Sequence, residues 1–234
     1  MMPNADPVQS LFDGKSKGWN AKYAPGGPLA QRVILFAQSL ATSAPPPAKV
    51  LDLGCGTGNL AAALAERGYN VIGTDIAEGM IRQARMSFPS AKVDWQLLPV
   101  NWTRLPVPDG SLDAVVSSSV FEYLPDLRHA FSECARVVRP GGYLLLTVPN
   151  VLNRVRRLER LIKPVAHVMA AVQPLGQIAA LRRYADYLQL SQNRLTPDGW
   201  NAEAHRAGLG PAETPALPDA PPLVLLKFKK YSTG

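Results

Sequence analysis

The stretch VLDLGCGTGNL at positions 50–60 decides the fold of this chain. It starts as a short apolar run, reaches Asp52 and continues with glycines at positions 54, 56 and 58. A strand that ends in a glycine-rich turn before a helix lets a ligand approach the backbone closely. Three classes of ligand use such a turn, so the neighbouring residues decide which class is bound.

Two of these classes fit the loop poorly. A phosphate-binding Walker loop needs a lysine and a hydroxyl after its last glycine, whereas Asn59 and Leu60 stand there. A dinucleotide site spaces its glycines as G-x-G-x-x-G, whereas this loop reads G-x-G-x-G and follows Asp52. A carboxylate at that place repels a pyrophosphate, so the loop favours a ligand with an ammonium or sulfonium group.

A second carboxylate narrows the choice further. Asp75 ends the apolar run VIGTD and follows Gly58 by 17 positions. A carboxylate there can accept hydrogen bonds from both hydroxyls of a ribose. The glycine loop, Asp52 and Asp75 together favour S-adenosylmethionine.

The chain from 49 to 148 alternates short β-prone runs with helical stretches, which predicts an α/β domain with a mostly parallel sheet. Glycine and proline mark the ends of several segments, including RPGG at 139–142, which we expect to turn the third helix into the next strand. We expect strands at 49–52, 69–75, 92–98, 112–117 and 143–148, and helices at 59–67, 77–86 and 126–138.

The flanking segments predict a single domain over residues 1–234. A helix at 28–40 before the APPPA break indicates an N-terminal helical cap, and Thr196 and Pro197 begin a C-terminal helix that Gly208 ends. The final apolar run at 222–231 is typical of a strand. The expected parts are the cap at 1–48, the core at 49–150, a helical lid at 151–190 and the C-terminal helix and strands at 191–234.

Composition excludes several functional classes. At 234 residues and 47% apolar content the chain is a globular protein, and its start lacks the pattern of a secretory signal, so we expect a cytoplasmic location. Cys55 and Cys134 do not have a metal-ligand spacing, and the three histidines lie far apart. We therefore expect no protein-bound metal and no disulfide.

The positive charge is concentrated in one segment. The chain has a net charge of +7, and residues 151–185 alone carry +6. An apolar stripe follows 151–163 at helical spacing, with arginines opposite, so either a lid helix with a solvated face or a contact with an anionic membrane or substrate is indicated. The stripe consists of Val151, Leu152, Val155, Leu158, Leu161 and Ile162.

Four segments resemble the successive motifs of the class I S-adenosylmethionine-dependent methyltransferases. They are VLDLGCGTGNL, VIGTDIAEGMIRQA, LPVPDGSLDAVVSSSVFEYLPD and ARVVRPGGYLLLTVP, and they cover about residues 48–150 in order. The resemblance implies a Rossmann-like fold with a mostly parallel seven-stranded sheet, helices on both faces and a lid after the fifth strand. It also implies S-adenosylmethionine as the donor and S-adenosylhomocysteine as the product.

The resemblance also assigns residues to the parts of the donor. In such proteins an acidic residue often meets the adenine amine where this chain has Asn101, and Trp102 beside it could stack on the ring. Tyr23 either reaches the donor's carboxylate or packs in the core. The remaining positions that match the motifs are Asp52, Gly54, Cys55, Gly56 and Gly58 at the methionine part, Asp75 and Ile76 at the ribose, and Ser117 and Ser118 after the fourth strand.

The catalytic residue stays open. The family's frequent histidine in vLEHv corresponds to Tyr123 in VFEYL, so Tyr123, His167 and His205 are weak candidates for a base. His129 belongs to a helix that we expect on the far side of the sheet. A sulfonium methyl is already activated, so the enzyme mainly aligns a nucleophile and excludes water.

We expect methyl transfer to a small-molecule or lipid-like acceptor, with oxygen favoured over nitrogen or carbon. The SSSV loop lacks the N/D-P-P-Y pattern of nucleic-acid amino methylators, so no nucleic-acid partner is expected. One alternative is a donor-binding adaptor that acts through the basic helix at 151–163, and another is a nicotinamide-dependent oxidoreductase. The oligomeric state is left open.

Overall fold

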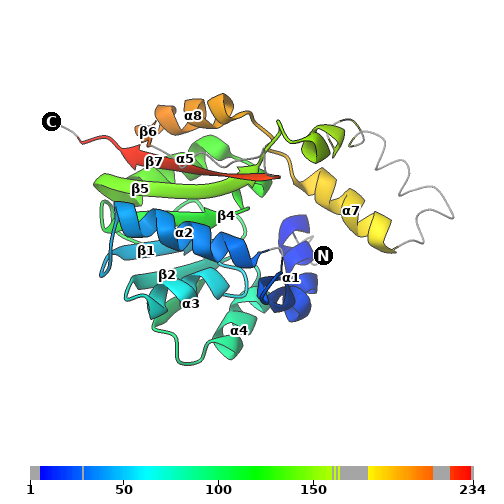
Figure 1. The fold of residues 1–234 in the computed structure, drawn as a ribbon, viewed down its shortest axis with the longest axis horizontal. Coiled ribbons are helices and arrows are strands. Elements are labelled where there is room, and N and C mark those ends of the chain that lie inside the picture. Colours follow the sequence, from blue (N-terminus) through cyan, green and yellow to red (C-terminus); the bar gives the residue numbers. More distant parts are fainter. Residues whose placement is uncertain are drawn as a thin grey trace.

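The fold is a twisted seven-stranded sheet covered by helices (Figure 1). A computed structural model describes residues 6–27, 29–159, 161, 163, 179–212 and 222–232. The strand order is β3-β2-β1-β4-β5-β7-β6; β1 to β5 are parallel, while β7 runs antiparallel between β5 and β6. The strands are β1 Lys49–Leu53, β2 Asn70–Asp75, β3 Val93–Leu97, β4 Leu112–Ser118, β5 Val138–Pro149, β6 Leu209–Pro211 and β7 Leu223–Lys230. The predicted mostly parallel seven-stranded sheet is confirmed.

Helices cover both faces of the sheet (Figure 1). One apolar core joins α2 and α3 to the strands, and the other joins α5 and α8 to the opposite face. Two short 3-10 turns, η1 Asn20–Tyr23 and η2 Phe121–Tyr123, lie near the strand ends. The helices are α1 Pro7–Trp19, α2 Ala30–Ser43, α3 Asn59–Glu66, α4 Glu78–Ser87, α5 Leu127–Val137, α7 Ala179–Leu190 and α8 Pro197–Arg206.

The order in which the strands are added to the sheet reverses between β1 and β4, and this switch point places a crevice at their carboxyl ends. From β1 the chain proceeds outward to β2 and β3 and then returns to β4 on the other side of β1. Asp52, near the end of β1, pairs with Gly73 on β2 and with Val116 on β4. Ligands of open α/β sheets bind at this switch point, so the fold brings Asp52 to the expected site.

The N-terminal cap contains two helices, whereas the sequence predicted one. Besides α2, helix α1 begins at Pro7, and the carboxylate of Asp6 accepts hydrogen bonds from the amides of Val8 and Gln9, both at 2.9 Å. The signal was present, because an aspartate followed by proline is a common helix start. Gly14 and Gly18 weaken the helical pattern behind it.

Helix α1 is anchored across the carboxyl ends of the strands. The side-chain amide of Gln9 donates to the carbonyl of Ile76 at 3.0 Å, and the amide of Gly79 donates to the carboxylate of Asp13 at 2.7 Å. Figure 1 shows α1 at the end of the sheet where β1, β2 and β4 finish. The cap therefore closes the crevice from one side.

The helical segment after β5 exposes its apolar stripe, whereas a packed lid helix would bury it. Residues 154–159 are helical, yet Leu152, Val155 and Leu158 on the apolar stripe are between 57% and 59% exposed. Glu159 is instead buried and binds Arg156. The expected solvated arginine face is thus wrong for Arg156, because the ion pair faces inward; Ile162 lies outside the described residues.

Within the described parts of the chain, no helix is long and apolar enough to cross a membrane.

Candidate functional site

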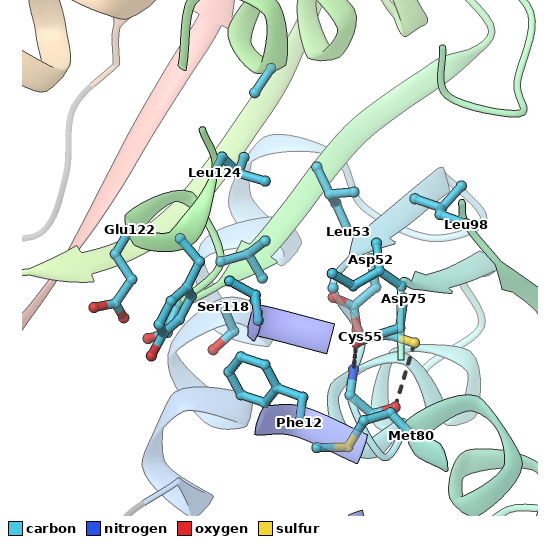
Figure 2. Close-up of a pocket in the computed structure, with 18 of the residues that line it drawn as sticks. Phe12, Asp52, Leu53, Cys55, Asp75, Met80, Leu98, Ser118, Glu122 and Leu124 are labelled. Atoms are coloured by element: carbon cyan, nitrogen blue, oxygen red, sulfur yellow. Dashed lines mark hydrogen bonds between the residues drawn. The ribbon is translucent and has the colours of Figure 1, made fainter. Parts of the chain in front are cut away.

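A cavity of about 1040 Å³ lies at the carboxyl ends of β1, β2 and β4. Its walls come from the strand-end loops, from α1 and α2, and from the segment after β5. Figure 2 shows Asp52, Asp75 and Cys55 together on one side, Glu122 on the other, and Phe12 of α1 between them. The volume exceeds what one small ligand needs, so the cavity has room for a donor and an acceptor together.

Most residues predicted for the donor reach this cavity. They come from segments that are far apart in the sequence, and the sheet brings their ends to one edge. Those that line it are Tyr23, Asp52, Gly54, Cys55, Gly56, Asp75, Ile76, Asn101, Trp102, Ser118 and Tyr123.

Asp52 is a buried carboxylate whose oxygens make no hydrogen bond within the described part of the chain. The residue is 1% exposed, and both oxygens are enclosed. Burial raises its pKa from 3.8 to about 8; the negative charge of Asp75 adds to the rise, and the nearby backbone of Ala61 opposes it. A buried acceptor without a donor is costly, so the site favours a cationic ligand here.

Asp75 is held by the backbone of two loops. Its Oδ2 accepts a hydrogen bond from the Gly56 amide at 2.8 Å, and its Oδ1 accepts one from the Ala77 amide at 2.9 Å. Burial raises its pKa to about 6, although these amide bonds act against the rise. Each carboxylate oxygen keeps a further lone pair, which leaves acceptors for two hydroxyl groups.

The three loop glycines have different roles. Gly54, Gly56 and Gly58 have φ values of 75°, 55° and 84°, a left-handed region that glycine adopts without strain. A Cβ on Gly54 would lie 2.2 Å from Val120, whereas one on Gly56 would face the cavity, with its nearest atom 3.7 Å away on Trp19. Only Gly56 keeps a path open for a ligand beside it.

Gly58 serves the packing of the helix start. A Cβ there would lie 2.5 Å from Trp95 and 2.9 Å from Ala84, and the residue does not line the cavity. That Gly58 lies under the methionine part of the donor therefore stays a prediction, with no support from the cavity lining. Its glycine is required because the turn into α3 packs against β3 and α4.

Three other predicted residues are not brought to the cavity. The Ser117 hydroxyl is buried and donates to the Leu53 carbonyl at 2.9 Å, which links β4 to β1. His205 lies on α8 against the ring of Tyr231, outside the cavity lining. His167 lies outside the described residues.

The part of the cavity near Asn101 and Trp102 includes a histidine, which the sequence did not predict there. His129 on α5 lines the cavity with its ring 5.8 Å from that of Trp102. Helix α5 packs on the face of the sheet opposite α2 and α3, but its first turn lies beside the loop after β3 and so brings His129 to the cavity. Asn101 and Trp102 line the same part of the cavity, so a planar ring system has a flat neighbour and polar groups there.

Two cations from the N-terminal cap form the positive end of the cavity. The Arg32 guanidinium donates to the Ser119 hydroxyl at 3.0 Å, and the Lys22 ammonium lies 3.5 Å from the ring centroid of Trp19. Burial lowers the pKa of Lys22 to about 8, and the charges of Lys15 and Arg32 lower it further. Sequence reasoning missed both; the single arginine in the apolar helix α2 was the available signal.

The wall opposite the carboxylates is a buried ionic cluster around Glu159, which the sequence did not reveal. Glu159 accepts hydrogen bonds from Arg156 at 2.8 Å, from Arg194 at 2.7 Å and from Tyr184 at 2.8 Å. Burial acts to raise its pKa, but these three donors outweigh it and the pKa is lowered. Arg156 also donates to the Tyr187 hydroxyl at 2.8 Å, so the cluster fixes the lid segment beside the cavity.

Glu122 and Tyr123 face the cavity from η2. Glu122 is buried, and its Oε2 accepts a hydrogen bond from the Ser191 hydroxyl at 2.6 Å. Burial raises the pKa of Glu122, while Ser191 and the arginines around it oppose the rise. Burial raises the pKa of Tyr123 strongly, and the charge of Glu122 adds to this, so its phenol stays protonated. Tyr123 is therefore a poor base.

Metal and thiol chemistry find little support at this site. Within the described residues no group of three or more His, Cys, Asp or Glu side chains is placed to hold a metal ion. Both cysteines are buried and unpaired with each other, and burial raises the pKa of Cys55 and Cys134. These thiols are protonated and act as packing groups.

Comparisons with known proteins agree with this geometry. The family described as "Methyltransferase domain" matches residues 51–146. A "Ubiquinone biosynthesis O-methyltransferase" of Xanthomonas campestris is 32% identical over 180 residues, which cover 76% of this chain and 72% of that protein. The chain belongs to the class I S-adenosylmethionine-dependent methyltransferase family.

Other members of the family match over different lengths. A "Malonyl-[acyl-carrier protein] O-methyltransferase" of Methylococcus capsulatus is 35% identical over 176 residues, or 72% of this chain and 63% of that protein. The chain thus spans somewhat less than two thirds of that relative. A solved magnesium protoporphyrin IX methyltransferase of Synechocystis has the same fold at 17% identity, with a TM-score of 0.69 over 95% of this chain and 98% of that one.

The residues that line the cavity fit the donor of this family. Asp52 would meet the positive charge with a buried carboxylate that makes no hydrogen bond within the described residues, and Asp75 would offer acceptors to the ribose hydroxyls. Gly56 leaves the backbone accessible between them. Arg32 and Lys22 line the cavity at the other end, where their positive charge would suit the donor's carboxylate.

Proposed function

We propose that this chain transfers the methyl group of S-adenosylmethionine to a small-molecule or lipid-like acceptor, most readily at an oxygen atom. The observation that carries the proposal is the buried carboxylate of Asp52, which lies beside Asp75 in the cavity without a hydrogen-bond partner in the described chain. A bound sulfonium would give this charge its partner. The donor brings an activated methyl group, so the protein's task is to hold and align the two reactants.

The charges of the cavity support one orientation of the donor. The carboxylates of Asp52 and Asp75 lie at the ends of β1 and β2, and the cations Lys22 and Arg32 lie at the N-terminal cap. In this orientation the ribose lies at Asp75, the sulfonium near Asp52 and the methionine carboxylate near Arg32. Trp102 then lies on the adenine side.

The wall formed by η2 and the lid segment is where we place the acceptor. Tyr123 and Tyr187 present their rings to each other at 6.5 Å, and Phe12 closes on Tyr123 at 5.3 Å. These aromatic side chains suit an apolar or ring-containing acceptor. The preference for oxygen is supported by the relatives named malonyl-[acyl-carrier protein] O-methyltransferase and ubiquinone biosynthesis O-methyltransferase.

A hydroxyl acceptor has to lose a proton, and Glu122 is the group that we propose to receive it. Its carboxylate lines the cavity, and burial raises its pKa toward the range where a general base works. The Ser191 hydroxyl holds one of its oxygens at 2.6 Å, which orients the carboxylate and leaves the other oxygen available. Tyr123 remains protonated and is better suited to donate a hydrogen bond.

The alternatives have weaker support. A nicotinamide cofactor would bring a pyrophosphate to the unpartnered Asp52, which is unfavourable. A donor-binding adaptor without activity does not explain why the cavity continues past the donor residues to Glu122 and Tyr187. Binding of NADH, seen as a fluorescence change that S-adenosylmethionine does not reverse, would favour the oxidoreductase.

The acceptor is best identified in a mixture of candidate compounds. The purified protein is incubated with a methyl-labelled donor and a metabolite and lipid extract, and mass spectrometry shows which compound gains the label. The proposal predicts that the labelled product is a methyl ether or a methyl ester. No such product should form with Asp75→Ala. Label on a nucleic acid, or no transfer by a protein that binds the donor, would contradict it.

A further inference from the structure

The outer face of the helix after β5 is apolar and exposed. Val155, Leu158 and Leu161 are 57%, 57% and 73% exposed, and Leu152 just before the helix is 59% exposed. Residues three positions apart advance by about 300° around a helix, so Val155, Leu158 and Leu161 share an arc of about 120°. We call Leu152, Val155, Leu158 and Leu161 the outer apolar face.

The opposite side of this helix is fixed by buried polar contacts. Arg156 and Glu159 bind each other there, and Arg194 contributes a second ion pair to Glu159 at 2.7 Å. Lys163 also points to this side and donates to the Ser191 carbonyl at 3.0 Å. Rotating the helix to bury its apolar residues would break these pairs and leave a buried charge, so the apolar face is held outward.

Positive charge flanks the outer apolar face. Arg154 and Arg157 are exposed and lie on the outward side of the helix, whereas Glu159, the acidic residue of segment 151–163, is buried in its ion pairs. The segment carries a net charge of +4. Exposed aliphatic side chains beside exposed arginines match the surface of a bilayer that contains anionic lipids.

We infer that the outer apolar face, together with Arg154 and Arg157, docks the protein on an anionic phospholipid membrane. The aliphatic side chains enter the boundary between headgroups and acyl chains, and the two guanidinium groups bind lipid phosphates. The helix lies in the plane of the interface and does not cross the bilayer. Charge decides against a second copy of the chain as the occupant, because pairing two such faces brings four arginines together.

The docking face is continuous with the cavity. Arg156 and Glu159, on the inner side of the same helix, line the cavity together with Tyr187. A docked protein therefore holds the wall of the cavity where we place the acceptor within one helix diameter of the lipid. This gives a membrane-resident acceptor a short route to the site; that route rests on the proposed methyl transfer, whereas the docking itself does not.

Vesicle flotation tests the docking with the full chain. The wild type is mixed with vesicles of phosphatidylcholine alone or with phosphatidylglycerol added, and it should float only with the anionic vesicles. A variant with Val155→Ser, Leu158→Ser and Leu161→Ser should bind at least tenfold more weakly, since aliphatic burial is lost. Arg154→Gln with Arg157→Gln should cost about 30-fold, from about 1 kcal/mol for each arginine.

Matched controls use exposed residues of the same type elsewhere. Met86→Ser with Leu97→Ser removes apolar side chains that are 69% and 50% exposed, and Arg82→Gln with Arg128→Gln removes two exposed charges. Both controls should float like the wild type. Donor titration of every variant verifies the fold and separates a failure of docking from a failure of the proposed function.

Three results would overturn the inference. The wild type could fail to bind anionic vesicles at low salt, or the triple serine variant could float as well as its control. Sedimentation analysis could instead show a dimer that the triple serine variant loses, with no vesicle binding, which would assign the face to a second copy of the chain.

Discussion

The backbone amide of Gly56 donates a 2.8 Å hydrogen bond to the carboxylate of Asp75, which ties the glycine loop after β1 to the end of β2. The contact joins residues 19 positions apart and sets the spacing of the two loops that form the donor site. Gly56 needs a left-handed φ of 55° to point its amide at Asp75. The orientation of the Asp75 carboxylate therefore depends on the backbone of the glycine loop.

Gly56→Ala is predicted to weaken donor binding beyond its effect on stability. A left-handed alanine costs about 1–2 kcal/mol, and the new methyl group projects into the cavity. Gly208→Ala is a matched control, because Gly208 has a φ of 79° with no atom near its Cβ position and lies outside the cavity. Urea unfolding and donor titration should show similar stability losses but weaker binding only for Gly56→Ala. Equal donor affinity in both variants would contradict the assignment.

Gly58→Ala should show the reverse pattern. Its methyl group would meet Trp95 at 2.5 Å and Ala84 at 2.9 Å, so the packing of α3 against β3 has to change. We expect a loss of unfolding free energy at least 1 kcal/mol larger than that of Gly208→Ala. Donor affinity of the folded protein should fall less than in Gly56→Ala. A stable Gly58→Ala protein would show that the helix start is looser than the structure indicates.

Donor affinity is predicted to rise with pH up to about 8. The pKa of Asp52 is about 8 in the free protein, and a sulfonium favours the ionised carboxylate, so binding releases a proton below this pH. Between pH 6.5 and 8 the dissociation constant should fall by up to about tenfold per unit. Asp52→Asn should bind weakly and should lose this rise of affinity with pH. The same pH dependence in Asp52→Asn would exclude Asp52 as its source.

The same group gives the unliganded protein an unusual pH dependence of stability. Between pH 3.8 and about 8 the folded state binds more protons at Asp52 than the unfolded state does, so this contribution to stability is lost as the pH rises. Asp52→Asn should therefore gain stability relative to the wild type from pH 5 to pH 8. Urea unfolding across this range measures the difference, and a constant difference would contradict the raised pKa.

Glu122→Gln is predicted to lower the rate of transfer without changing donor affinity. Loss of a general base typically costs about 10² to 10⁴ in rate, and the limb of the pH profile that rises with ionisation of Glu122 should disappear. Ser191→Ala removes the hydrogen bond to Glu122 but keeps the carboxylate, so it should retain most of the rate. If Ser191→Ala and Glu122→Gln lose equal activity with unchanged pH profiles, Glu122 has only a structural role.

Most residues that the sequence predicted for the donor line one cavity, because the signals that identify them are local. An apolar run, three glycines and Asp52 lie within a few residues of one another, and Asp75 ends the next strand. Parallel strands carry such ends to one edge of the sheet. The packing role of Gly58 could not be predicted, because the same glycine pattern serves both ligand access and packing, and the pattern does not contain Trp95.

The wall of the cavity where we place the acceptor depends on contacts between segments that are far apart in the sequence. Local sequence patterns do not encode such contacts. Glu122 meets Ser191 across 69 positions, and Glu159 meets Arg194 across 35. Helical periodicity also identified the stripe with Val155 and Leu158 but not which side is buried. A buried ion pair reversed the usual arrangement, in which the apolar stripe faces the core.

Calorimetric titration with S-adenosylmethionine tests the central claim most directly. The wild type should bind one donor per chain near pH 8, and Asp75→Ala should bind at least tenfold more weakly, because two charge-assisted hydrogen bonds to the ribose are lost. Asp113→Ala, which removes a carboxylate that binds Arg139 outside the cavity, serves as the control and should bind like the wild type. No detectable binding by the folded wild type, or unchanged affinity in Asp75→Ala, would contradict the account.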